Sequence, residues 1–258
     1  MYFKTIDFSK FSSIKVGTAI EVLMLEREDE IPNDRLIIGH ANNLLVSPTP
    51  PPLMMLSKDF SFMEMEDDVL TVGCATPTGK LLSFAKKNDL AGFEFISKLP
   101  GSIGGMLAMN AGVKSYEIFN ILDAIKIDGE WVEKKDIEYG YRFAKLNGVA
   151  TEVQFVVKRG FSKELLDELV NLRSNQPKTA SAGSAFKNPV GDYAGRLIEE
   201  VGLKGASKGD MQWSELHANF LVNHGKGTFE EAKYLIDLVK ERVFEQFKIE
   251  LKEEVQIL

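Results

Sequence analysis

Cysteine is almost absent from this chain of 258 residues, which contains only Cys74. A single cysteine forms no disulfide within the chain, and it excludes a metal cluster built from several thiolates. Disulfides are typical of oxidising compartments, so a chain without them suits a reducing one. The composition therefore predicts a cytoplasmic protein without a metal centre.

Long apolar runs are also missing. The longest uncharged stretch, residues 41–57, is interrupted by four prolines, whereas a membrane-spanning helix needs about 20 mostly apolar residues. Residues 1–10 include three charged side chains and lack the apolar core of a signal peptide. We therefore expect no membrane span and no secretory leader.

Positive charge is in short supply, because the formal net charge is -7. A protein that binds nucleic acid needs a basic surface to neutralise phosphates, so this negative net charge argues against a nucleic-acid partner. Small anion sites remain possible, since main-chain amides and a few lysines can form them. Hydrophobic residues make up 44% of the chain, which is ordinary for a folded protein with its own core. No obligate protein partner is indicated.

The hydrophobic pattern predicts an α+β chain with a change of character near Gly160. Short apolar segments and turns fill the first part, whereas helical spacing dominates afterwards. Ser162 is expected to cap one helix, and Thr228 with Glu231 forms a capping box for another. The expected strands are residues 20–25, 36–38, 53–56, 60–65, 69–74, 121–127, 131–134, 149–158 and 249–258, and the other expected helices are residues 78–87 and 194–201.

A glycine-rich segment, residues 100–112, is the first candidate site. Glycine lets the backbone approach a ligand closely, and successive main-chain amides can cradle a pyrophosphate. The alternative is a tight loop before a buried helix, and the residues alone leave both open. The candidate ligand-binding residues of this segment are Pro100, Gly101, Ser102, Gly104, Gly105, Asn110, Ala111 and Gly112.

A second candidate is the turn that follows residues 36–38 and contains Gly39, Ala41, Asn42 and Asn43. Amides at a strand end can bind phosphate, although such junctions often carry glycine and asparagine for purely structural reasons.

A third candidate segment presents a hydroxyl from Ser184, an ammonium from Lys187 and an amide from Asn188, which together suit an anionic ligand. A polar loop is the alternative. Arg142 could bind a carboxylate with its planar, always-charged fork. Glu254 lies on the polar face of the last expected strand. Taken singly, both are more typical of a solvated surface.

Five segments, taken in order, resemble the UDP-N-acetylenolpyruvoylglucosamine reductase family. The resemblance covers nearly the whole chain and is carried by the sequences of residues 100–112, 181–189, 194–205, 217–223 and 251–255. It implies a two-part FAD-binding fold of the FAD-linked oxidase type, followed by a C-terminal α+β substrate-binding domain.

The resemblance also implies a division of the chain. Residues 1–160 would bind FAD through two subdomains, about 1–58 and 59–160. Residues 161–247 would bind substrate, and residues 248–258 would return as a strand to the FAD-binding part.

The implied reaction is the reduction of UDP-N-acetylglucosamine enolpyruvate to UDP-N-acetylmuramate. NADPH would supply the electrons through bound FAD, in the synthesis of the peptidoglycan wall that sets cell shape and permits division. The family's catalytic trio corresponds to Arg142, Ser184 and Glu254. Lys187 and Asn188 would contact the substrate.

Three positions depart from the family pattern. Ala41 and Asn42 stand where the family usually has glycine and serine, and Ala144 replaces a common serine. The chain resembles the family's shorter branch, so we expect a more open substrate site. Two alternatives stay in view: another FAD oxidase of the same fold, which would react with oxygen, and a colourless module that binds nucleotide-sugars.

Overall fold

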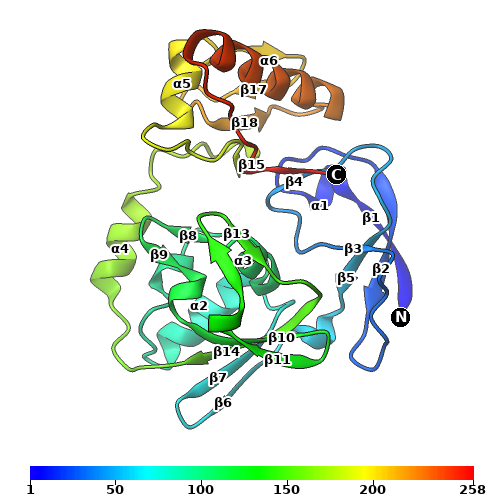
Figure 1. The fold of residues 1–258 in the computed structure, drawn as a ribbon, viewed down its shortest axis with the longest axis vertical. Helices are drawn as coiled ribbons and strands as arrows, with labels where there is room; N and C mark the ends of the chain where they lie inside the picture. The colour runs from blue at the N-terminus through cyan, green and yellow to red at the C-terminus, as the bar shows by residue number, and fades with distance from the viewer. The chain divides into compact units, whose positions relative to one another are not determined.

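The structure, a computed structural model, describes residues 1–258, and the chain divides into two units. The first unit consists of residues 1–4, 22–40 and 52–174, and the second of residues 5–21, 41–51 and 175–258. Each unit is therefore assembled from segments that are far apart in sequence. Figure 1 shows the path of the chain from the N-terminus in blue to the C-terminus in red.

Helices are few and mostly short. The longest is α6, Phe229–Phe247, in the second unit. The other α-helices are α1 Phe8–Phe11, α2 Thr78–Lys87, α3 Ile103–Ala108, α4 Lys163–Asn171 and α5 Ala194–Glu200. The 3-10 helices are η1 Lys58–Phe60, η2 Glu94–Ile96, η3 Ile118–Asn120 and η4 Lys134–Asp136.

The first unit contains a five-stranded antiparallel sheet in the order β11-β10-β14-β7-β6 (Figure 1, cyan and green). A second sheet has the order β1-β2-β5-β3, in which β2, β5 and β3 run parallel. Residues 5–7 of β1 and 19–21 of β2 are assigned to the second unit. Two small hairpins, β8–β9 and β12–β13, complete the unit. The bounds are β1 Tyr2–Asp7, β2 Ala19–Leu25, β3 Leu36–Ile37, β5 Leu53–Leu56, β6 Met63–Glu66, β7 Val69–Gly73, β8 Gly112–Val113, β9 Tyr116–Glu117, β10 Leu122–Ile127, β11 Glu130–Glu133, β12 Glu138–Gly140, β13 Phe143–Lys145 and β14 Ala150–Val156.

The second unit is built around an antiparallel sheet in the order β15-β18-β17-β16. A short parallel pair joins β19, near the C-terminus, to β4. The bounds are β4 Leu44–Leu45, β15 Ala180–Ser184, β16 Ser207–Lys208, β17 Met211–Trp213, β18 Phe220–Asn223 and β19 Gln256–Ile257.

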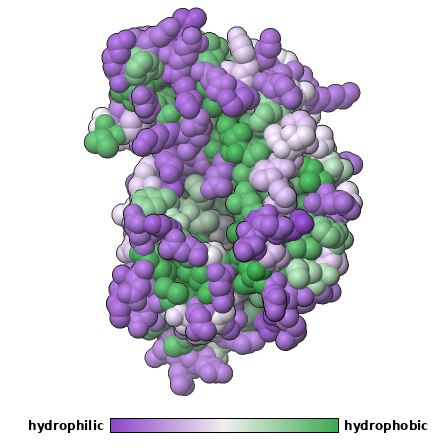
Figure 2. Space-filling view, turned by 45° about the vertical axis from the view of Figure 1, so that its right-hand side comes forward, coloured by the Kyte–Doolittle hydropathy of each residue, from purple (hydrophilic) through white to green (hydrophobic).

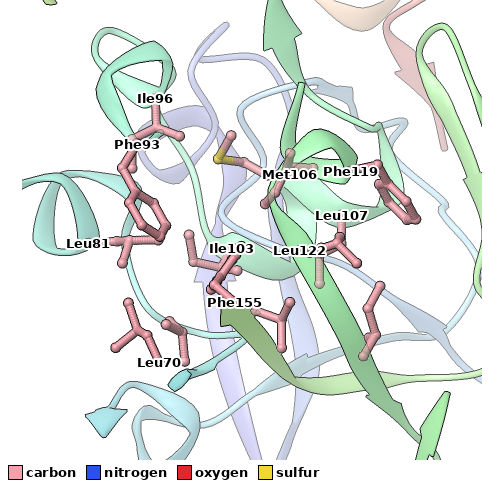
Figure 3. Close-up of a cluster of buried hydrophobic side chains, with 14 of the residues drawn as sticks. Leu70, Leu81, Phe93, Ile96, Ile103, Met106, Leu107, Phe119, Leu122 and Phe155 are labelled. Carbon is pink, nitrogen blue, oxygen red and sulfur yellow. The ribbon is translucent and has the colours of Figure 1, made fainter. Parts of the chain in front are cut away.

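The core of the first unit lies between the five-stranded sheet and the helices α2 and α3. Figure 3 shows side chains from the sheet and from α3 gathered in one cluster, among them Ile103, Leu107 and Phe155. These three are almost completely removed from solvent. Because α3 has only six residues, this burial rather than helix propensity keeps it formed.

The second unit has its own core, formed by α5, α6 and the sheet. Trp213 and Phe186 are fully buried there and stack with ring centroids 5.8 Å apart. The helix α6 begins with a complete capping box, since Thr228 and Glu231 each accept from the other's main-chain N–H. This arrangement satisfies two of the N–H groups that the first helical turn leaves without partners.

Most of the predicted elements are confirmed. The helix over residues 78–87 has those bounds and Ser162 caps α4. The strands expected at 60–65 and 69–74 pair as a hairpin, and so do those expected at 121–127 and 131–134. The prediction for the C-terminus is wrong in extent, because only Gln256–Ile257 is a strand. The residues before this strand pair with the rest of the second unit only at isolated points, such as the Phe186–Glu253 bridge. They therefore form no continuous ladder of strand hydrogen bonds.

No helix of the structure combines the length and apolar character that a membrane crossing requires. Figure 2 shows a surface that is mostly hydrophilic, with apolar residues gathered in patches between the polar ones. The exposed large hydrophobic side chains include Val190, Tyr193 and Leu216 in the second unit and Tyr139, Tyr141 and Phe143 in the first.

Candidate active site

A cleft of about 90 Å³ in the first unit collects part of the predicted cofactor segment. Its walls come from the turn after β3, from β5, from the end of β7, from the start of α3 and from the segment leading into β14. Gly39, Ser102, Gly104 and Gly105 line it. The two sequence segments expected to bind the cofactor therefore meet at one place.

The short helix α3 presents its glycines to this cleft. Ile103, Met106 and Leu107 are buried in the core, so they fix which side of the helix faces inward. Gly104 and Gly105 lie on the side that lines the cleft. The Ser102 hydroxyl caps the helix by accepting from the Gly105 N–H at 3.3 Å.

Two of these glycines lie in close contact with their neighbours. A Cβ on Gly39 would lie 2.6 Å from Ser102 Oγ, and one on Gly104 would lie 3.2 Å from Cys74 Cβ. A side chain at either position would therefore press against these neighbours. The N–H groups of Ile103, Gly104 and Gly105 at the start of α3 already donate to Thr76, Cys74 and Ser102. The glycines that line the cleft fit FAD in another respect, because a backbone without side chains lets a ligand approach closely.

His40 also lines the cleft, although it was not among the residues selected from the sequence. Burial lowers the pKa of its imidazole, while a hydrogen bond to the main chain of Gly101 works in the opposite direction. Gly101, with φ of 140°, also accepts from the Thr78 N–H at 3.0 Å. Gly101 and its neighbour Pro100 thus belong to a turn that is tied both to His40 and to the start of α2.

Asn110 is fully buried, and its side chain serves the protein interior. Its Nδ2 donates to Glu117 Oε2 at 2.8 Å and to the Gly140 carbonyl at 3.0 Å. Its Oδ1 accepts from the Phe119 N–H at 3.2 Å. The following Ala111 carbonyl accepts from Ile118 N–H. This end of the predicted cofactor segment lies outside the cleft-lining set.

Arg142 occupies the two-residue loop between β12 and β13. Its φ of 60° places it in the left-handed region, which is uncommon for a residue with a side chain. Its Nη2 donates to the Gly112 carbonyl at 3.0 Å, and its Nη1 lies 3.7 Å from Glu117 Oε1. The guanidinium also lies over the ring of Tyr141.

Ser184 and Glu254 come together in the second unit. Ser184 ends β15 and pairs with Phe220. The next residue, Ala185, accepts from the Glu254 N–H at 2.8 Å. Two of the three predicted catalytic residues, 70 positions apart in sequence (254 − 184), therefore belong to neighbouring backbone segments.

Asn43, predicted to contact the cofactor, holds the C-terminal segment. Its Nδ2 donates to the Glu254 carbonyl at 2.8 Å, and its own carbonyl accepts from the Gln256 N–H at 3.0 Å. Asn42 Nδ2 donates to Ser13 Oγ, and the buried Ala41, with φ of 51°, accepts from the Ser13 N–H. These three residues lie in the second unit, whereas Gly39 lies in the first.

The predicted substrate residues follow Ser184 directly. The Lys187 N–H donates to the Lys252 carbonyl at 2.9 Å, which fastens this loop to the C-terminal segment. Asn188 Oδ1 accepts from the Ala194 N–H at 3.1 Å, at the first residue of α5.

Asn219 fixes the backbone beyond Ser184 from both sides. Its Oδ1 accepts from the Phe186 N–H at 3.0 Å, and its Nδ2 donates to the Phe186 carbonyl at 2.8 Å. The nearby His217 Nδ1 accepts from the Asn219 N–H at 3.3 Å. Burial lowers the pKa of His217, which favours the neutral ring that this acceptor role needs.

Comparison with known proteins decides the family. The family described as "UDP-N-acetylenolpyruvoylglucosamine reductase, C-terminal domain" matches residues 176–258. A UDP-N-acetylenolpyruvoylglucosamine reductase from Helicobacter hepaticus is 46% identical over 257 residues, with 98% of each chain covered. The protein of that name from Campylobacter jejuni strain RM1221 is 45% identical over 258 residues, covering 98% of this chain and 99% of its own. The chain belongs to the UDP-N-acetylenolpyruvoylglucosamine reductase family.

A solved structure of the family confirms the predicted fold. The crystal structure of UDP-N-acetylenolpyruvylglucosamine reductase from Thermus caldophilus matches with a TM-score of 0.86 and 30% identity, covering 100% of this chain and 99% of the other. The chain thus has the α+β architecture of the reductase family, with an FAD-binding part and a substrate-binding domain.

Sequence reasoning missed three residues that lie beside the predicted ones: His40 in the cleft, Glu117 beside Arg142 and Asn219 behind Phe186. Asn219 lies in residues 217–223, one of the five segments that carry the resemblance, so its motif was a usable signal. His40 and Glu117 carried no signal of their own, because nothing local distinguishes them from ordinary polar residues.

Proposed function

We propose that Arg142, Ser184 and Glu254 carry out the reaction of this chain. The reaction itself follows from membership of the family: the chain reduces UDP-N-acetylglucosamine enolpyruvate to UDP-N-acetylmuramate for peptidoglycan synthesis, with FAD as cofactor and NADPH as reductant. Bound FAD would supply the chemistry of hydride transfer between NADPH and the β-carbon of the substrate's double bond.

Arg142 stabilises the negative charge that hydride addition creates. That charge develops on the α-carbon and spreads into the adjoining carboxylate. A guanidinium offers two parallel N–H groups to a carboxylate, which binds more strongly than a neutral donor. A charged group fixed in advance costs no reorganisation when the charge appears. The fixed position of Arg142 against Gly112 and Glu117 supports this role.

Ser184 donates the proton that completes the product, and its hydroxyl transfers it to the α-carbon. Glu254, in its protonated form, donates a hydrogen bond that stabilises the charged intermediate. The observation that carries the proposal is the 2.8 Å hydrogen bond between the Glu254 N–H and the Ala185 carbonyl. This bond brings the backbone of Glu254 next to that of Ala185, the neighbour of Ser184, and so supports a shared role for the two side chains.

The cofactor-binding part of the proposal rests on the cleft of the first unit. Its lining includes Gly39, Ser102, Gly104 and Gly105, and residues 1–160 hold FAD. Residues 161–247 bind the nucleotide-sugar, with Lys187 and Asn188 near its charged groups. Residues 248–258 supply Glu254. The proposed cofactor set also includes Ala41, Asn42, Asn43, Pro100, Gly101, Asn110, Ala111 and Gly112.

The remaining partners are small molecules, namely the enolpyruvyl sugar and NADPH. Neither nucleic acid nor an obligate protein partner belongs to the proposal. Location in the cytoplasm does belong to it, and the lone buried Cys74 supports a reducing compartment.

The test follows the two halves of the reaction separately under nitrogen. In Ser184→Ala, NADPH should bleach the flavin at the normal rate, since this step needs no proton from Ser184. Subsequent reoxidation by the enolpyruvyl sugar should slow by about 10² to 10⁴, the usual contribution of a positioned proton donor. Ser181→Ala, which removes a half-buried hydroxyl from the same strand, is the matched control.

Normal reoxidation in Ser184→Ala would remove the serine from the mechanism. A purified wild-type protein without flavin absorption would contradict the cofactor assignment itself.

A further inference from the structure

The side chain of Arg142 is held by one register position of a neighbouring hairpin. In the β8–β9 pair, Gly112 lies directly opposite Glu117. Arg142 Nη2 donates to the carbonyl of the first at 3.0 Å, and Nη1 pairs with the carboxylate of the second at 3.7 Å. Both charged side chains are about one-fifth exposed. At this exposure water screens the pair less than it would at the surface.

The carboxylate of Glu117 is itself fixed from behind. Its Oε2 accepts from Asn110 Nδ2 at 2.8 Å, whereas Oε1 faces the guanidinium. The same Nδ2 donates to the carbonyl of Gly140 at 3.0 Å, two residues before Arg142. One buried amide therefore links the carboxylate to the backbone of the arginine loop.

The close approach of this hairpin depends on glycine. A Cβ on Gly112 would lie 2.1 Å from the Tyr116 carbonyl oxygen and 2.8 Å from Glu117 Cγ. Any side chain there would therefore push Glu117 away from its present position. The left-handed conformation of Arg142 is unfavourable for a residue with a side chain, and packing and hydrogen bonds must offset its cost.

We propose that Glu117, held by Asn110, is a positioning residue that fixes the guanidinium of Arg142 for the substrate carboxylate. The proposal rests on the function proposed above for Arg142. An arginine side chain has several rotatable bonds and loses entropy when a ligand immobilises it. The pairing with Glu117 immobilises the Arg142 side chain in the folded protein, so the guanidinium is already ordered when substrate arrives.

The main test is Glu117→Gln, which keeps the shape and removes the charge. We expect reoxidation of the reduced flavin by the enolpyruvyl sugar to slow by about tenfold to a hundredfold, the usual cost of a misplaced catalytic group. KM for the sugar should rise, while the rate of flavin reduction by NADPH should not change. A group that only maintained the fold would alter both halves together.

Glu138→Gln is the matched control, because Glu138 lies on β12, is largely exposed and pairs only loosely with Lys145. It should leave both rates within about twofold of the wild type, as surface changes normally do. Glu117→Asp retains the carboxylate, and should recover part of the lost rate. It also provides the test if Glu117→Gln does not fold.

Arg142→Lys separates this inference from the proposed function. If that variant reoxidises normally, the role of Arg142 fails, and the positioning role fails with it. If it is slow while Glu117→Gln stays within about twofold of the wild type, only the positioning role is overturned. In the double variant, the loss should be smaller than the product of the two single losses, since both act through one guanidinium.

Equal loss of both half-reactions in the two Glu117 variants, together with loss of flavin, would also overturn the positioning role and leave Glu117 a structural residue.

Discussion

The two units use their backbones in different ways around the candidate site. In the first unit, glycines without side chains line a cleft, and the core side chains of α3 pack behind them. In the second unit, main-chain groups bond to one another, and this pairing brings the backbone of Glu254 next to Ala185, the neighbour of Ser184. The first arrangement suits a bound cofactor, whereas the second suits the alignment of reactive side chains. Matched substitutions in the two units can test this difference.

The largest effect is expected from cavities in the two cores. Ile103→Ala in the first unit and Ile236→Ala in the second remove similar fully buried side chains. Each should lower the free energy of unfolding by about 2–5 kcal/mol, as measured by denaturant titration. Only Ile103→Ala should reduce the flavin content of the purified protein, because only it lies beneath the cleft. Equal flavin loss in both variants would contradict the expectation that only the core of the first unit supports the cofactor cleft.

The next largest effect concerns the clamp on Phe186, that is, the two hydrogen bonds between the Asn219 side chain and the Phe186 main chain. Asn219→Ala leaves a buried N–H and a buried carbonyl without their partner, at a cost of about 1–3 kcal/mol for each group. Substrate-driven reoxidation should slow, because the Ser184 backbone is no longer fixed, while flavin content should persist. Gln246→Ala removes an exposed amide from α6 and serves as the control. Unchanged stability in Asn219→Ala would show that the clamp is dispensable.

Helix caps offer a smaller and closely matched comparison. Ser102 caps α3 in the first unit, and Thr228 caps α6 in the second. Alanine at either position should cost about 1 kcal/mol of stability. Ser102→Ala alone should weaken FAD binding in a fluorescence titration, since Ser102 lines the cleft. Should Thr228→Ala weaken FAD binding as much, the effect would reflect general destabilisation.

The smallest effect is a pH dependence shared by the units. Burial lowers the pKa of His40 in the first unit and of His217 in the second below the usual value of 6.5. The unfolded chain therefore binds protons that the folded chain does not, as the pH falls below 6.5. Stability should be fully present above this pH and decline below it. Denaturation midpoints measured across the range should flatten in His40→Gln and His217→Gln, and His224→Gln is the control.

Local signals predicted many of the elements correctly. Ser162, Thr228 and Glu231 lie within one turn of the helices they cap, so the physics of the cap is contained in a few adjacent residues. The hairpin around Asp128 and Gly129 is equally local, since both turn residues have positive φ. The extent of the last strand failed because strand pairing depends on a partner elsewhere in the chain.

The site was predicted only in part, and the reason is sequence separation. The glycines of residues 100–112 indicated a close approach to a ligand, which the cleft supports for Gly104 and Gly105. Nothing local indicated that Asn110 would bond to Gly140, 30 residues away, or Asn219 to Phe186, 33 residues away. Such partners depend on how the sheets and loops pack.

The sequence by itself determined the single thiol, the acidic balance, most helix and hairpin positions and the motifs that identify the reductase family. These properties reside in composition or in short windows, where adjacent residues set the energetics. Only the tertiary structure decided that Glu117 lies beside Arg142 and that Glu254 follows the backbone next to Ser184. Hydrogen bonds and ion pairs between distant segments form only when the packed core brings those segments together, and no local preference encodes that choice.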